Sequence, residues 1–135
     1  MRRLLGIVAV SALLAACNSH APVAAPRPAD PVPLFAGLGD RSRAADTSSV
    51  EAQRYFDQGV SFLYAFNHDG AIRSFRHAAA LDPDCAMAWW GIAVANGPHI
   101  NNPVVPEERA RAAWDALQRA QAASADASDA DRALI

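Results

Sequence analysis

The 135-residue sequence contains no lysine, so all 12 of its basic residues are arginines. The absence of lysine excludes Schiff-base chemistry and a phosphate-binding loop that ends in lysine. Two cysteines are too few for a disulfide framework. Neither sign of charge is in large excess, because 14 acidic residues leave a formal net charge of −2. This balance argues against a nucleic-acid partner.

Large apolar side chains are also scarce. The hydrophobic fraction of 52% is inflated by alanine, which accounts for 32 residues, whereas aromatic residues make up only 7%. We therefore expect a core of small, closely packed side chains. A chain of this length forms one domain at most.

The first 17 residues have the pattern of an export signal. Two arginines precede an apolar stretch from Leu4 to Leu14, which suits a signal sequence and is too short to span a bilayer. Residues 14–17, Leu-Ala-Ala-Cys, resemble the lipobox of bacterial lipoproteins. That resemblance implies that the signal peptide, 1–16, is removed and that Cys17 carries lipid. It also implies a lipid anchor in the bacterial cell envelope, at the outer membrane facing the periplasm if the cell is Gram-negative. The alternative is an ordinary secretory signal with a coincidental cysteine.

Residues 17–49 have the composition of a flexible, disordered tether. Five of the nine prolines lie between Pro22 and Pro33, and the apolar residues follow neither the helix nor the strand period. We expect this segment to hold a domain away from the membrane. Within it, Phe35 and Leu38 are candidates for docking onto that domain.

Residues 50–135 are predicted to form helices only, because apolar residues recur there at close to a 3.6-residue spacing. The expected helices span 50–66, 70 to Pro83, 85–95, 106–123 and a short segment after Ser128. Their expected N-caps include Asp69, Asp84 and Ser128.

Seven residues within 52–85 fall at the spacing of the 34-residue tetratricopeptide (TPR) motif. They are Tyr55, Gly59, Phe62, Ala71, Phe75, Ala78 and Pro83. The segment therefore resembles a TPR unit, although Gln58 stands where the motif usually has an aliphatic residue. A second unit over 86–127 fits with an eight-residue insertion within 97–106, and an incomplete third covers 128–135.

This resemblance implies an all-α fold, a TPR-type solenoid of antiparallel helix hairpins that follows the signal peptide and tether. Longer bacterial TPR proteins of undescribed function are similar around Phe66-Asn67-His68 and Trp89-Trp90-Gly91. Each repeat leaves an apolar face that a neighbour must bury, so about three repeats are needed for stability. We therefore expect either a fragment of a longer protein or a partner, such as the second copy in a homodimer, that covers the C-terminal end.

The repeat phase assigns four residues to the concave face, where TPR proteins bind extended peptides. These residues are Phe56, Tyr64, Met87 and Trp90. A protein or peptide partner is therefore expected in that groove, with packing of Trp90 against the inserted loop as the alternative. His68, His99 and Asn101 are loop candidates for a ligand contact, and capping of turns is the alternative for them.

No metal site and no cofactor are expected, because His68, His77, His99 and Cys85 do not have metal-ligand spacing. Cys85 begins a predicted helix, so a reactive thiol paired with a histidine is one interpretation, and a small buried packing residue is the favoured one. No catalytic residue is predicted. Two functions remain. One is a membrane-anchored scaffold that binds a protein or peptide. The other is the N-terminal part of a larger TPR protein whose ligand-binding or catalytic site includes His68, Cys85 and the 97–106 loop.

Overall fold

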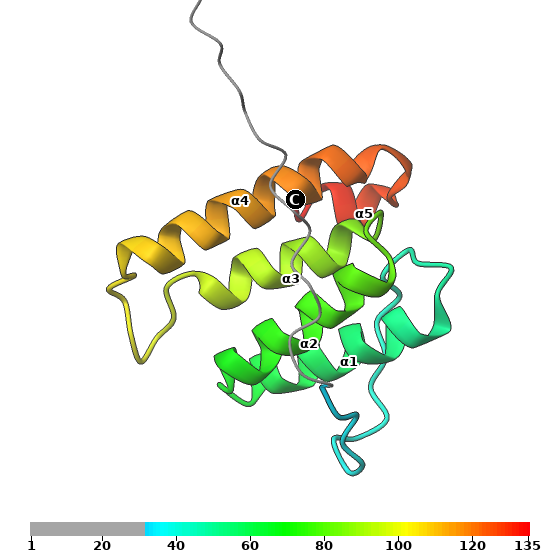
Figure 1. Cartoon of the computed structure of the whole chain (residues 1–135), viewed down its shortest axis with the longest axis horizontal. Helices are drawn as coiled ribbons and strands as arrows, with labels where there is room; N and C mark the ends of the chain where they lie inside the picture. The colour runs from blue at the N-terminus through cyan, green and yellow to red at the C-terminus, as the bar shows by residue number, and fades with distance from the viewer. Residues whose placement is uncertain (1–31) are drawn as a thin grey trace, which may run out of the picture.

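The computed structural model describes residues 32–135, and this range contains helices and no strand (Figure 1). The helices are α1 (Val50–Tyr64), α2 (His68–Leu81), α3 (Ala86–Asn96), α4 (Glu107–Ala123), the 3₁₀ turn η1 (Ser124–Asp126) and α5 (Asp129–Arg132). Each of α1 to α4 packs against the next in antiparallel order, as two successive hairpins. The prediction of an all-helical domain is confirmed. The predicted signal peptide and Cys17 lie outside the described residues.

None of the helices within 32–135 is long and apolar enough to cross a membrane. The connection between α3 and α4 covers 97–106, which is the segment predicted to carry the insertion. Figure 1 shows it as a long loop at the same end of the molecule as the turn between α1 and α2.

The helix caps differ in two places from those predicted. Asn67, rather than Asp69, caps α2, because its side-chain oxygen accepts the Gly70 N–H at 3.0 Å. Cys85, rather than Asp84, precedes α3, and no side chain caps that helix. The prediction for α5 is confirmed, since the Ser128 side chain accepts the N–H of the third residue of that helix.

The turn between α1 and α2 explains why Asn67 becomes the cap. Phe66 has φ of 60°, and the Asn67 N–H donates to the Phe62 carbonyl at 2.9 Å. This bond closes α1 in the manner of a Schellman motif, in which glycine usually takes the left-handed position. Phenylalanine costs about 1 kcal/mol there relative to glycine. The turn fixes Asn67 one residue before the new helix.

The core is organised around the ring of Phe75, which is fully buried in α2. A methyl group on Gly59 of α1 would lie 2.5 Å from this ring, and one on Gly91 of α3 would lie 2.6 Å from it. Glycine therefore lets both helices approach the ring more closely than any other residue would allow. Ala71 and Ala78 are fully buried as well, as their small size predicts.

Residues 32–49, which we call the strap, are packed against the helices and do not form part of a free tether. On α1, the Asp57 carboxylate accepts the Ser42 hydroxyl at 2.8 Å and the Arg43 N–H at 3.1 Å. Gln53 donates to the Arg43 carbonyl at 2.8 Å. The predicted tether boundary at residue 49 is therefore wrong, because polar side chains of α1 bind the main chain of the strap.

The strap also contacts the start of α3 and the short helix α5. The buried Cys85 thiol donates to the carbonyl of Ala45 at 3.2 Å. Asp46 accepts the Ser128 N–H at 2.8 Å, and this bond lowers the pKa of the Asp46 carboxyl. Arg43 forms an ion pair with the buried carboxylate of Asp131. These contacts connect the first hairpin to the C-terminal turn.

The glycine contacts predict that Gly59→Ala and Gly91→Ala both lower the free energy of unfolding. Alanine favours a helix by about 1 kcal/mol over glycine, whereas overpacking a sealed core costs about 1–3 kcal/mol. Contacts of 2.5 and 2.6 Å place the overpacking cost in the upper part of that range, about 2–3 kcal/mol, so we expect a net loss of about 1–2 kcal/mol by urea unfolding.

Gly97→Ala is the matched control for these variants. A methyl group there meets only two backbone carbonyl oxygens, the nearer at 3.3 Å, and no core ring. Its effect should stay within about 0.5 kcal/mol. Wild-type stability in both core variants would show that the ring is not confined between α1 and α3.

Candidate functional site

An open groove of about 960 Å³ lies between the strap, α1 and α3. Its apolar wall consists of Val60, Leu63 and Tyr64 from α1 and Trp90 from α3, and its strap wall includes Leu38, Arg41 and Arg43. We call this the Trp90 groove. Its two aromatic residues come from the first helix of each hairpin, so it lies on the face that two stacked hairpins share.

Two of the four predicted groove residues line the Trp90 groove. Tyr64 is 82% exposed at the end of α1, and Trp90 is half-buried beside it. Phe56 and Met87 are instead fully buried, and Phe56 packs on the ring of Phe75 with centroids 5.5 Å apart. Their assignment to the groove is wrong, because the inner part of this helical face belongs to the core.

The strap gives the groove its charged residues. Arg43 uses one amino group for the ion pair with Asp131, and its other amino group, Nη1, has no hydrogen-bond partner among the described residues. Arg41 is exposed at the rim. The carboxylate of Asp57 is occupied by the strap. The groove therefore combines an aromatic wall with a wall that carries two guanidinium groups.

Two of the three loop candidates come together. The rings of His68 and His99 stack with centroids 4.0 Å apart and an interplanar angle of 18°. His99 and Asn102 exchange main-chain hydrogen bonds of 3.2 and 2.9 Å, which leaves Asn101 exposed at the tip of a tight turn. His68 Nδ1 lies 3.1 Å from the Phe66 carbonyl. The pair joins the turn between α1 and α2 to the loop between α3 and α4.

Cys85 behaves as the buried packing residue that the sequence favours. Burial raises the pKa of its thiol, and the thiol donates to a strap carbonyl. Burial and this hydrogen bond disfavour the nucleophilic interpretation, since a reactive cysteine needs an accessible thiol with a lowered pKa. Across 32–135, no group of three or more His, Cys, Asp or Glu side chains is arranged to hold a metal ion.

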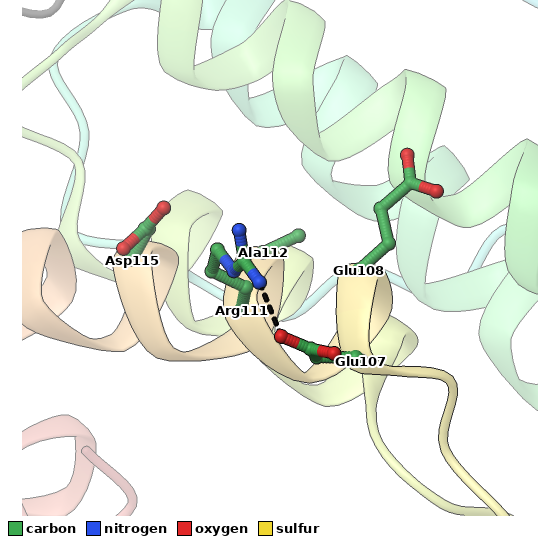
Figure 2. Close-up of a pocket in the computed structure, with 5 residues that line it drawn as sticks. All are labelled: Glu107, Glu108, Arg111, Ala112 and Asp115. Carbon is green, nitrogen blue, oxygen red and sulfur yellow. Dashed lines mark hydrogen bonds and ion pairs between the residues drawn. The ribbon is translucent and has the colours of Figure 1, made fainter.

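The outer face of α4 has a shallow hollow of about 380 Å³ (Figure 2). Arg111 turns toward Glu107, one helical turn earlier, and forms an ion pair with it at 2.5 Å. Both side chains are largely exposed, and such pairs on a helix surface contribute about 0.3–0.5 kcal/mol. We interpret this face as a solvated helix surface.

Phe35 and Leu38 dock on the domain as predicted, since Phe35 meets Phe62 and Leu38 lines the groove, but the sequence did not identify the rest of the strap as part of the site. The signal that could have found it is Gln58, whose polarity interrupts the predicted repeat motif. Gln58 is buried, and its side chain binds the main chain of the strap at Pro33 and Phe35. A polar residue at an apolar motif position indicates a partner that the motif itself does not contain.

Comparison with protein-family models, curated proteins and solved structures gives no match to this chain. Its family therefore stays a prediction from the residue spacing. The groove, the strap and the histidine pair are the features from which function can be inferred.

The environment of Cys85 predicts slow thiol chemistry and a specific pH dependence. In a Cys17→Ser chain, native Cys85 should react with a thiol reagent at least about tenfold more slowly than the same chain in denaturant. Because folding raises the pKa, the protonated thiol contributes stability that is complete below the unfolded pKa of about 8.5 and is lost as pH rises through the folded pKa.

The control is Cys85→Ala in the same background. The loss of stability between about pH 8 and pH 10 should be smaller in this variant, because it has no thiol to titrate. Equal reactivity of the native and denatured chains would contradict the buried, hydrogen-bonded thiol.

Proposed function

We propose that this protein is a lipid-anchored TPR protein of the bacterial cell envelope that binds an extended segment of a partner protein in the Trp90 groove. One observation carries the proposal: Tyr64 and Trp90, from the first helices of successive hairpins, line a single open groove. Stacked helical repeats use such surfaces for binding, and aromatic side chains are frequent anchors in interfaces.

The packing of the helices supports a TPR interpretation. Small residues of the motif are buried where helices meet, and Phe75 fills the space between α1, α2 and α3. The first helix of the second hairpin repeats that of the first after 34 residues, so that Trp89 and Trp90 correspond to Tyr55 and Phe56, and the second helix follows at 42 residues. The insertion between α3 and α4 is the main departure from a regular repeat.

The lipobox-like run at Leu14–Cys17 supports the location. Each methylene group of an acyl chain that enters the bilayer contributes about 0.8 kcal/mol, and more than one chain gives a stable anchor. Because the strap is packed on the helices, only residues 17–31 separate the proposed lipid from the domain. The groove would then act close to the membrane surface.

A ligand contact at the His68–His99 pair is a second candidate function. The stacking of two imidazoles from separate turns favours it, because the fold brings two hydrogen-bonding rings together at one place. In this case the chain would be the N-terminal part of a larger TPR protein. Cys85 would have no chemical part in that site, because its thiol is buried and protonated.

The groove predicts that peptides selected from a displayed random library bind through Trp90. With the full Cys17→Ser chain in mild detergent as bait, selected peptides should bind Trp90→Ala at least about thirtyfold more weakly, which is the loss of a binding hot spot. Fluorescence anisotropy measures the dissociation constants, and circular dichroism confirms that the variant is folded.

Trp114→Ala is the matched control, because Trp114 is an exposed tryptophan of α4 outside the groove. It should bind the selected peptides as the wild type does. If no peptide is enriched, or if both tryptophan variants bind equally well, the groove is not a peptide site.

The anchor predicts the mass of the protein isolated from native membranes. Intact mass spectrometry should find Cys17 as the first residue, carrying acyl chains. An unmodified Cys17, or retention of residues 1–16, would contradict the lipid anchor and leave the proposal for the groove to be judged separately.

A further inference from the structure

Gln58 binds main-chain groups on both sides of one strap residue. Its side-chain oxygen accepts the Phe35 N–H at 2.8 Å, and its side-chain nitrogen donates to the Pro33 carbonyl at 3.0 Å. The residue between them is Leu34, which packs against the core. Gln58 itself is only 5% exposed. An amide buried to this extent is costly unless both of its ends are hydrogen-bonded.

Two further side chains complete this arrangement. The Gln58 nitrogen also donates to the hydroxyl of Ser74, which is fully buried and donates in turn to the Gly70 carbonyl at 3.0 Å. The Tyr55 hydroxyl donates to the Val32 carbonyl at 2.8 Å. We call Tyr55, Gln58 and Ser74 the Gln58 site. It contacts the main chain of Val32, Pro33 and Phe35, which belong to one four-residue segment of the strap.

The segment in the Gln58 site contributes apolar side chains as well as main-chain groups. The Phe35 ring meets Phe62 edge to face, with centroids 5.8 Å apart. Pro33 has no N–H that would need a partner, and proline favours the extended conformation seen in bound peptides. Beyond Phe35 the strap turns at Gly37 and Gly39, which both have positive φ. The bound segment is therefore separated from the rest of the strap by a glycine turn.

We propose that the Gln58 site is a peptide-binding site for extended, proline-containing apolar segments, and that residues 32–35 occupy it as an intramolecular ligand. None of Tyr55, Gln58 and Ser74 lines the Trp90 groove, so the proposal stands independently of the function proposed above. A segment joined to its site by a short linker has an effective concentration of about 1 mM. A free peptide therefore binds only when residues 32–35 leave the site.

The test uses a fluorescein-labelled peptide with the sequence of residues 30–37 as the probe. In the full Cys17→Ser chain, Leu34→Asp should release the intramolecular ligand, and the probe should then bind saturably by fluorescence anisotropy. The chain with an unchanged strap should bind the probe at least about tenfold more weakly than the Leu34→Asp chain, because the strap competes for the site. Adding Gln58→Leu to Leu34→Asp should abolish binding. Leucine is chosen because the repeat motif usually has an aliphatic residue at this position.

Trp90→Ala in the Leu34→Asp chain is the control that separates the two sites, and the probe should bind this double variant undiminished. Two results would overturn the proposal: no saturable binding to the Leu34→Asp chain, or equal binding with and without Gln58. Loss of binding in the Trp90 control would place the probe in the other groove and would overturn it too.

If the Leu34→Asp chain does not fold, hydrogen exchange in the chain with an unchanged strap tests whether residues 32–35 are bound by Gln58. The Phe35 N–H should be protected at least about tenfold relative to a free peptide, because Gln58 accepts it. Gln58→Leu should remove that protection while amides in the centre of α2 stay protected. Exchange of the Phe35 N–H at the free-peptide rate in the unchanged chain would overturn the proposal.

Discussion

The fold depends on the confinement of one phenylalanine ring between two glycines. Phe75 extends from α2 toward both α1 and α3, and each of these helices presents a glycine where the ring approaches. This contact joins the first hairpin to the second, in a domain whose other buried apolar residues are mostly alanines. Small side chains give little apolar area each, so the few large buried side chains, above all the Phe75 ring with its close contacts on two sides, determine how the hairpins stack.

The strap is fixed on the helices largely through hydrogen bonds. Polar side chains of α1, namely Gln53, Asp57 and Gln58, bind its main chain and fix it on the helices. In this position its arginines form one wall of the Trp90 groove, and the aromatic residues of α1 and α3 form the other. The groove is therefore built jointly by an irregular segment and two helices, and its shape depends on the strap being bound.

The sequence predicted the helices well because local signals determine them. Apolar spacing and Pro83 placed the ends of the four long helices to within two residues, whereas the cap of α2 depended on the left-handed backbone of Phe66. Apart from Phe35 and Leu38, the strap was missed because its composition resembles a linker, and its partners lie 8 to 88 residues later in the sequence. Tyr64 and Phe56 occupy one helical face, and only tertiary packing determines that the first is exposed and the second buried.

The contact between Phe75 and the two glycines is the claim on which the stacking of the hairpins, and hence the groove, depends. Nuclear Overhauser spectroscopy of the protein in solution measures it directly. We expect cross-peaks from the Phe75 ring protons to the α-protons of both Gly59 and Gly91, with those α-protons shifted by the ring current. Cross-peaks to Gly59 alone would contradict the account, because the second hairpin would then not be packed on the first.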